Sequence, residues 1–466
     1  MVGVWQQDRW SSTGARAIAT ARSIDSGASW STPMVLPFSA CGGGGGPGAI
    51  FDRASDPWVT FAGSGVVLAS ALAFSANNIN GGLATAGGLS AVLVSRSADG
   101  GSTWGTPVRV IYDTNPSCTP ACYFNDRDSI TADPASGRAF LVWDRLTNAT
   151  NASSPAYLAL SVDGGITWPG TGQLYDPGTN NEAFNNEIAV LPNGTVLDFF
   201  TLLTPTSSQL QVVSFTTTGA SWSTPTLLAT VAPITPAGTP NPIGSSATSI
   251  RDSSLMAQIA LDPASGAIAA IWQQSFGGST SDGRMFDGIA LSVSKDSGTT
   301  WSTPKQVNGI KTVAAFSPTV RYLTGSVLAI TYYDFRDYAA GSSVLNTSAW
   351  LSESSDGGTT WHELRLQSPF DLNKAPLAGH GFGTALFLGD NQGLALVGTN
   401  PLPFYAATTS AGAHVYATQS PNPLTSSSAH VYMAAAQRPL PAAAAANAQA
   451  SVERMRLRAF SPRGRP

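Results

Sequence analysis

Charged residues are scarce in this chain. Only 11% of the 466 residues are charged, and 24 Lys and Arg stand against 28 Asp and Glu, for a formal net charge of −4. Nucleic-acid-binding and anionic-membrane-binding proteins usually carry a basic patch, and the Arg residues before the C-terminus are dispersed. We therefore expect no nucleic-acid partner, and the few charged residues become the main candidates for a functional site.

Cysteine and histidine are also rare. Three Cys are too few for a disulfide scaffold, although Cys118 and Cys122 bracket three residues and can close a small disulfide that leaves Cys41 over. The four His are scattered, three of them after residue 370, and show no metal-ligand spacing. We expect neither a bound metal nor a cofactor.

Long hydrophobic runs are missing as well. The best apolar run, VVLASALAF, is about half the length that spans a bilayer, so we expect no membrane span. The chain begins at Met1 with VGVWQQDRW, which already has the pattern of a strand rather than of a signal peptide. We interpret this start as a truncated form of an exported protein, which favours an extracellular or periplasmic location.

What the chain does have is Gly (47), Pro (31) and a repeated eight-residue motif, Ser-x-Asp-x-Gly-x-Thr-Trp, called the box below. In each box the Asp can accept hydrogen bonds from its own turn, Gly supplies a positive φ, and Trp can pack on a neighbouring unit. We therefore expect the box Asp residues to be structural. The copies, the fourth of them degenerate, are Ser23–Trp30, Ser97–Trp104, Ser161–Trp168, Thr216–Trp222, Ser294–Trp301 and Ser354–Trp361.

The segments around each box predict four strands. Two apolar runs joined by a tight turn, as in EIAVLPNGTVLDFF, come first, a third run leads into the box, and a fourth follows it. Such a repeated unit is a β-propeller blade. We predict an all-β fold, a six-bladed β-propeller of four-stranded antiparallel blades, or seven blades if the C-terminal strands form their own.

The domain limits follow from the same pattern. We expect the propeller to span residues 1–415, with the first strand of the first blade missing and with TALFLGD and LALVGT closing the ring against the N-terminal blade. Residues 416–466 are rich in Ala, Pro and Arg and lack patterned apolar positions, so we expect a disordered tail there.

Two further motifs, YYDFRD (Tyr332–Asp337) and GDNQGLA (Gly389–Ala395), complete a resemblance. With its boxes, the chain resembles the sialidase superfamily, and more narrowly bacterial sialidase-like proteins of the exo-α-sialidase type, over roughly residues 1–410. The resemblance implies three Arg that hold a substrate carboxylate, a Tyr nucleophile activated by a Glu, and an Asp as acid/base. The Phe-Arg-Ile-Pro motif that carries the first of those Arg in the family is absent.

Candidate site residues come from the loops that enter first strands and leave second strands, because these loops meet on the face opposite the boxes. Planar guanidinium groups suit a carboxylate ligand. Some of these residues equally suit a local role, since an Arg beside an Asp often forms a surface ion pair, and Glu187 beside Asn can bond to loop backbone. The binding candidates are Arg53, Arg127, Arg251 and Arg336. The catalytic candidates are Tyr333, Glu187 and, as the acid, Asp52, Asp56 or Asp126.

The function we expect first is a sialidase-like glycoside hydrolase that acts on terminal acidic sugars as a monomer, with an acidic glycan as its partner. A second hypothesis is a non-catalytic propeller that binds glycans or proteins through the same face. A third is a lyase or hydrolase for uronate-containing polysaccharides, which would also need Arg clamps and a Tyr base.

Overall fold

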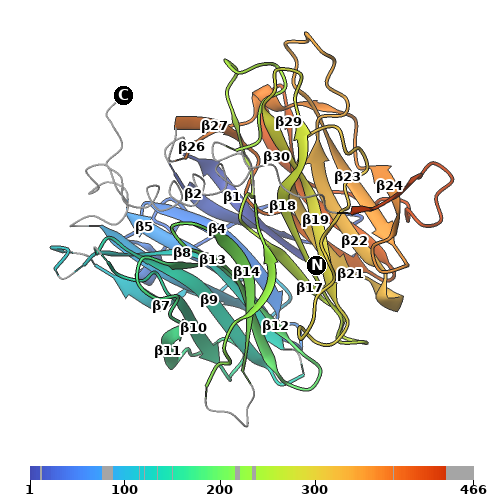
Figure 1. Ribbon diagram of the computed structural model, residues 1–466. Coiled ribbons are helices and arrows are strands. Elements are labelled where there is room, and N and C mark those ends of the chain that lie inside the picture. Colours follow the sequence, from blue (N-terminus) through green and yellow to red (C-terminus); the bar gives the residue numbers. More distant parts are fainter. Residues whose placement is uncertain are drawn as a thin grey trace.

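Antiparallel strands make up almost the whole computed structural model (Figure 1). The structure describes residues 1–10, 13–75, 88–114, 116–119, 121–133, 135–149, 151–215, 221–232, 238–380 and 383–436. No helix in these ranges is long and apolar enough to cross a membrane. Their three helical segments are single 3₁₀ turns, η1 (Gly46–Gly48), η2 (Thr324–Ser326) and η3 (Leu372–Lys374).

The first half of the chain forms four groups of strands in chain order, called sheets 1 to 4 here, of which the first two are joined into one seven-stranded sheet by the pairing of Ala15 with Ala54. Sheet 1 comprises β1 (Val2–Arg9), β2 (Ala15–Arg22) and β3 (Met34–Leu36). Sheet 2 comprises β4 (Arg53–Phe61), β5 (Val67–Ser75), β6 (Leu89–Ser97) and β7 (Val108–Asp113). Sheet 3 comprises β8 (Tyr123–Asp133), β9 (Arg138–Thr147), β10 (Ala156–Ser161) and β11 (Gly170–Tyr175). Sheet 4 comprises β12 (Glu182–Val190), β13 (Val196–Leu203), β14 (Ser208–Phe215) and β15 (Thr226–Thr230).

The second half adds three more sheets of this kind and one small sheet. Sheet 5 comprises β17 (Gln258–Leu261), β18 (Ile268–Ser279), β19 (Met285–Ser294) and β20 (Lys305–Gln306). Sheet 6 comprises β21 (Ala315–Tyr322), β22 (Leu328–Asp334), β23 (Asn346–Ser354) and β24 (Thr360–Arg365), with β25 (Phe370–Asp371) on β23. Sheet 7 comprises β28 (Gly393–Val397), β29 (Asn400–Thr409) and β30 (Gly412–Ala417). The small sheet comprises β16 (Ile250–Arg251), β26 (Leu377–His380) and β27 (Gly383–Phe387).

The hydrophobic core is divided among the gaps between successive sheets. Each of the six apolar clusters found in the described residues joins two sheets that follow one another, from sheets 1 and 2 to sheets 6 and 7. The second strands are therefore covered on both faces, and β5 and β22 are buried along their whole length. This explains why they are continuous apolar runs rather than alternating ones.

The box forms the turn between the third and fourth strands, as its sequence indicated. In Ser97–Trp104 the Asp99 carboxylate accepts bonds from the Thr103 backbone N–H (2.9 Å) and hydroxyl (2.7 Å), and the Ser97 hydroxyl accepts from Gly101 N–H (2.8 Å). Hydrogen bonds, first from the Thr103 side chain and then from its backbone, hold the pKa of Asp99 below its usual value. The degenerate fourth copy lies mostly outside the described residues.

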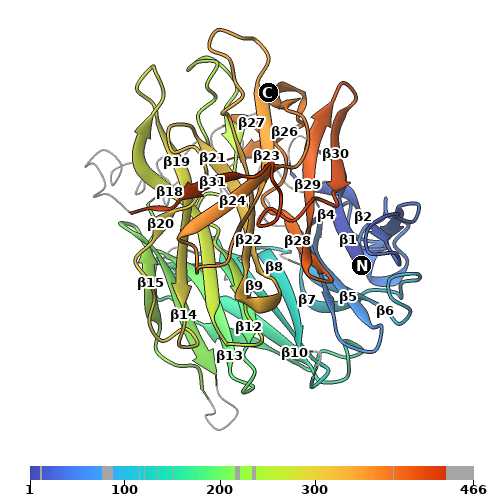
Figure 2. The same ribbon diagram turned by 90° about the vertical axis from the view of Figure 1, so that its right-hand side faces the viewer.

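The boxes in the described part of the chain also lie against a neighbouring sheet. The Gly at the fifth position of the box lies against the preceding sheet in four copies, at Val2 for Gly101, Leu68 for Gly165, Leu197 for Gly298 and Leu291 for Gly358. Gly27, in the first box, lies against Leu402 of sheet 7, and β29 and β30 stand beside β1 and β2 in Figure 2. Sheet 7 therefore lies beside sheet 1.

Gly165→Ala is expected to destabilise the protein more than Gly164→Ala. Both glycines have positive φ (85° and 68°), so both variants carry a similar backbone strain. A Cβ at Gly165 would overlap Leu68, whereas a Cβ at Gly164 meets no atom within 4 Å. Overpacking should add about 1–3 kcal/mol to the loss of unfolding free energy for Gly165→Ala, measured by urea unfolding. Equal losses would show that the box does not pack on sheet 2.

The C-terminal part differs from the sequence-based expectation. The segments TALFLGD and LALVGT do not pair with the N-terminal sheet among the described residues: β27 pairs with β16 and β26, and β28 pairs with β29. Within the expected tail, β31 (His430–Met433) pairs with β24 and β32 (Ala435–Ala436) pairs with β20. Polar, weakly patterned residues are ordered there because two neighbouring edge strands offer them backbone partners. Residues 437–466 lie outside the described part.

The small disulfide that the sequence allowed is present, and Cys41 is exposed. Cys118 and Cys122 are bonded with their Cα atoms 4.4 Å apart, in the loop that leads into β8. Asn148 lies against this loop, and its side-chain oxygen accepts a hydrogen bond from Cys122 N–H at 2.9 Å.

Candidate functional site

The same β-bulge recurs in the first strands of four sheets. In β4, β8, β12 and β21 two residues oppose one residue of the second strand. The first residue of each bulge has a positive φ, which is costly for residues other than Gly and is often found at functional sites. These residues are Asp56 (50°), Arg127 (55°), Asn185 (58°) and Ser317 (49°).

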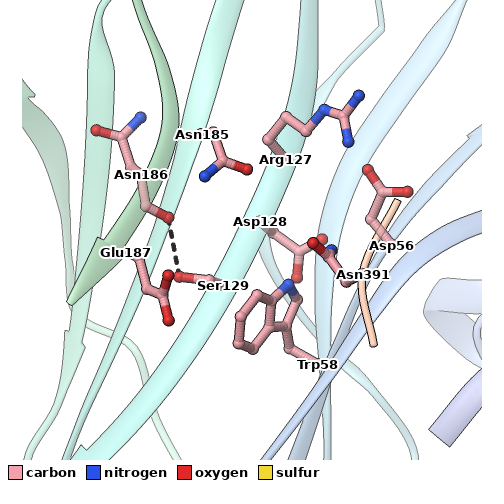
Figure 3. A pocket seen from close by; sticks show the side chains of 9 residues that line it. All are labelled: Asp56, Trp58, Arg127, Asp128, Ser129, Asn185, Asn186, Glu187 and Asn391. Atoms are coloured by element: carbon pink, nitrogen blue, oxygen red, sulfur yellow. Dashed lines mark hydrogen bonds between the residues drawn. The ribbon is translucent and has the colours of Figure 1, made fainter. Parts of the chain in front are cut away.

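The bulges of sheets 2, 3 and 4 line one pocket together with Asn391 of the loop before β28 (Figure 3). The pocket is narrow, with room for about one water molecule among these side chains, and it opens to solvent. Figure 3 shows Arg127 and Asp56 on one side of the pocket and Glu187 on the other. The lining residues are Asp56, Trp58, Arg127, Asp128, Ser129, Asn185, Asn186, Glu187 and Asn391.

Two of the four predicted arginines meet at one carboxylate beside this pocket. Asp390 accepts a hydrogen bond from Arg127 Nη1 (2.9 Å), and its two oxygens accept from Arg251 Nε (3.2 Å) and Nη2 (2.5 Å). All three side chains are largely buried. Burial alone would lower the pKa of Arg127, but Asp390 and further carboxylates outweigh it and raise that pKa.

A third arginine, Arg9 at the end of β1, belongs to the same cluster. The guanidinium groups of Arg9 and Arg251 lie over the ring of Phe387, 4.6 and 4.3 Å from its centroid. Burial lowers the pKa of Arg9 to about 10 and the charge of Arg251 adds to this effect, while Asp390 opposes it. These three residues, Arg9, Arg127 and Arg251, are called the arginine cage below. They lie in β1 of sheet 1, β8 of sheet 3 and β16 of the small sheet.

Glu187 is a half-buried acid in the pocket lining. One oxygen of its carboxyl accepts from Ile259 N–H at 3.1 Å. Burial raises the pKa of Glu187 to about 8, against which this one hydrogen bond acts only weakly. At neutral pH the group is therefore mostly protonated and able to donate a proton.

Hydrogen bonds from neighbouring strands and loops hold Asn185 and Asn186 in the pocket lining. Asp144 of β9 accepts bonds from the Asn185 backbone N–H (2.9 Å) and from the Asn186 side chain, so it holds the bulge of β12. The Asn185 side chain in turn donates to Ala257 O at 2.9 Å. Across the pocket, Ser129 donates to Asn186 O at 3.0 Å, the dashed line in Figure 3. The lining is thus held by bonds to three sheets.

The pocket combines groups that suit a sugar. Trp58 offers an apolar ring face, and the amides of Asn185 and Asn391 can donate to and accept from hydroxyl groups. Within the described ranges no group of three or more His, Cys, Asp or Glu residues is placed to hold a metal ion. Three carboxyl groups line the pocket, those of Asp56, Asp128 and Glu187, and burial raises the pKa of Asp128 well above its usual value.

Other predicted site residues lie elsewhere. Arg53 donates to Thr13 O (2.8 Å), stacks on Trp10, and lies 3.9 Å from the Asp52 carboxylate, which is the local ion pair that its sequence context also suited. Asp126 precedes Arg127 in β8 but does not line the pocket. The structure therefore does not bring Arg53, Asp52 and Asp126 into the pocket lining.

The YYDFRD motif builds a separate cluster in sheet 6. Tyr333 is buried and its hydroxyl bonds to the backbone of Ala406, donating to O (2.8 Å) and accepting from N–H (3.1 Å). Arg336 is held by Asp334 and Glu363 and lies over the Trp350 ring, 3.6 Å from its centroid. Neither Tyr333 nor Arg336 reaches the pocket.

Several site residues were not among the sequence-based candidates. Asp390 and Asn391 belong to GDNQGLA, a motif that the sequence singled out without a role for its Asp. Arg9 ends WQQDR, a second-strand end of the kind that was searched. Nothing in the sequence indicated that Asn185 and Trp58 line the pocket, because the position of a β-bulge cannot be derived from a single sequence.

Comparisons with known proteins concern the fold. No family model and no curated protein matches the chain. Solved structures that it resembles include the Hadza microbial sialidase Hz136, at 14% identity and a TM-score of 0.47, covering 90% of this chain and 73% of that one. They also include the NanB sialidase of Streptococcus pneumoniae, at 13% identity and a TM-score of 0.49, covering 83% and 70%.

An α-L-arabinofuranosidase of Fusarium graminearum is similar to the same degree, with 12% identity and a TM-score of 0.45 over 78% of this chain and 91% of that one. These neighbours are sialidases and an arabinofuranosidase of sialidase-like β-propeller fold. We carry no residue role over from them to this chain.

Proposed function

We propose that this protein is a glycoside hydrolase that acts on a terminal acidic sugar in the pocket formed by the bulges of β4, β8 and β12. The observation that carries the proposal is the convergence of Arg127 and Arg251 on one carboxylate, with Arg9 nearby, beside Glu187, whose pKa is raised to about 8. Guanidinium forks suit the carboxylate of such a sugar, and a protonated carboxyl suits its leaving group.

In this proposal Glu187 donates a proton to the glycosidic oxygen as its bond to the anomeric carbon breaks, and Asp56 takes a proton from the water molecule that forms the new bond to that carbon. A raised pKa is what a general acid needs at neutral pH. Trp58 provides the surface on which a sugar ring rests, and Asn185 and Asn391 orient its hydroxyl groups. The sheets would form a closed propeller of seven blades, supported by the contact of Gly27 with Leu402 and by the separate sheet 7.

The other functions suggested by the sequence have less support. A lyase or a sialidase-type reaction with a tyrosine would need its hydroxyl at the pocket, but no Tyr is among the lining residues, and Tyr333 is bonded elsewhere. A non-catalytic glycan-binding propeller would use the same arginine cage, and it is distinguished by whether the bound sugar is cleaved.

The test is release from fluorogenic glycosides, using an α-sialoside and a β-glucuronide against a neutral arabinofuranoside. We expect the acidic substrates to be cleaved, and Arg127→Ala to lower kcat/KM for them about 10- to 150-fold, the equivalent of about 1.5–3 kcal/mol for a charge-assisted bond. Arg53→Ala, which removes an arginine paired outside the pocket, is the control and should retain activity. Binding of the acidic sugar without release would identify a lectin-like protein instead.

A further inference from the structure

Asp390 occupies the arginine cage in the way that a ligand would. It accepts bonds through both oxygens from Arg251 and through one from Arg127, which is the fork geometry by which arginine binds carboxylates. Asp390 is only 8% exposed, so the bonds are shielded from solvent. The carboxylate of a ligand would have to accept hydrogen bonds from the same guanidinium groups, those of Arg127 and Arg251.

The loop around Asp390 is anchored on one side and adaptable on the other. Asn391 accepts from the Gln258 side chain (3.1 Å), and Gln392 donates to Ser317 O (2.5 Å) and accepts from Thr331 (3.0 Å). On the other side, Gly389 has a φ of 125°, a conformation that side-chain-bearing residues rarely adopt. Glycine has the widest choice of backbone conformations, so a rotation that releases Asp390 is least restricted at Gly389, while hydrogen bonds hold Asn391 and Gln392.

We propose that Asp390 is a built-in competitor for the arginine cage, so that a carboxylate-bearing sugar binds by displacing it from Arg127 and Arg251. This inference rests on the proposed function for the identity of the ligand but concerns binding rather than cleavage. Its consequence is a reduced affinity: if the cage is open in about 1–10% of molecules, the apparent dissociation constant rises about 10- to 100-fold.

The charges around the cage are consistent with an exchange of carboxylates. Arg127 and Arg251 bond to Asp390, Arg9 donates to Gln6 and lies within electrostatic range of Asp390, and Asp56 lies within electrostatic range of both Arg9 and Arg127. Exchange of Asp390 for the carboxylate of a ligand keeps the number of negative groups at the guanidinium forks unchanged. The guanidinium groups then stay paired, and the energetic cost is the loss of the Asp390 ion pairs, which is smallest when the displaced carboxylate reaches solvent.

The experiment compares Asp390→Asn with the wild-type protein by calorimetric titration of D-glucuronic acid and N-acetylneuraminic acid, each beside its methyl ester. We expect Asp390→Asn to bind the free acids at least tenfold more tightly than the wild type, with little change for the esters, which lack the carboxylate. Asp390→Glu should bind them as weakly as the wild type, because its carboxylate still reaches the cage.

Asp126→Asn is the matched control for charge, since it removes one carboxylate near Arg127 without emptying the cage, and Asp126 does not line the pocket. An equal gain in Asp126→Asn, or unchanged or weaker binding of the acids in Asp390→Asn, would overturn the proposal. Should Asp390→Asn fail to fold, a structure of the wild type with glucuronate decides: the sugar carboxylate on Arg127 and Arg251 with Asp390 turned away supports the exchange, and a sugar bound with Asp390 in place contradicts it. These binding results stand whether or not any glycoside is cleaved.

Discussion

Replacement of Glu187 by Gln is expected to lower kcat on the cleaved glycoside about 10²- to 10⁴-fold, the usual contribution of a positioned general acid. Gln has nearly the same shape and keeps an oxygen to accept from Ile259 N–H, so the pocket should retain its form. What the variant loses is the proton. The measurement is kcat and KM for wild type and variant on the same substrate.

The pH dependence gives a second measure of the same group. Because the pKa of Glu187 is raised to about 8, kcat/KM should fall as pH rises through about 8, where the acid loses its proton. The stability follows the same sign: a pKa raised by folding contributes stability that is full below about 4.5 and is lost as pH rises towards 8. Glu187→Gln should therefore lose less unfolding free energy between pH 5 and pH 8 than the wild type.

Glu353→Gln is the matched control for these measurements. Glu353 is a buried carboxyl, and burial raises its pKa to about 7, but it lies in β23 and does not line the pocket. The control should change the dependence of stability on pH and leave kcat unchanged. If Glu187→Gln kept full kcat, Glu187 would not be the acid, whatever its pKa.

The strand order could be predicted from the sequence because the box is a local structure. The Asp99 carboxylate bonds within four residues of itself, so the turn needs no distant partner to form. Each box then marks a third and a fourth strand, and the apolar runs before it supply the first two. The C-terminal strands carry no box, and their pairing with distant strands could not be derived from such local signals.

The site was harder to predict, as Arg53 and Arg127 illustrate. Both follow an Asp near the start of a first strand, and their local sequences suggested the same role. Arg127 is itself the bulged residue of β8, whereas Arg53 lies three positions before the bulge at Asp56. The bulge position depends on pairing with the second strand, so two similar dipeptides end in different surroundings.

Tyr332 and Tyr333 show a second limit of pattern-based prediction. Alternation in a strand indicates that one of two neighbouring side chains faces the core and the other a free surface. In β22 both faces are covered, by sheet 5 on one side and sheet 7 on the other, so both tyrosines are buried. The sequence also could not indicate which carboxylate pairs with the arginine cage, because Asp390 lies 263 positions from Arg127 along the chain.

The largest expected loss of stability comes from Trp361→Ala in the last box. Trp361 is fully buried in the hydrophobic cluster between sheets 5 and 6. This cluster includes Leu291 of sheet 5, Val307 of the loop that follows it, and Leu328 and Ile330 of sheet 6. Its indole N–H donates to Gly358 O at 3.3 Å. Truncation leaves a large cavity between two sheets, and we expect a loss of about 3–5 kcal/mol in unfolding free energy, measured by urea unfolding.

Trp104→Ala, the same substitution in the second box, is the internal comparison. Trp104 is only partly buried at the edge of the cluster between sheets 1 and 2, so less apolar area returns to water and less cavity remains. We expect its cost to be clearly smaller than that of Trp361→Ala. Similar losses for both would mean that the tryptophans act through the turn of their own box. A graded loss that follows burial would show that each box contributes to stability through the sheet it lies against.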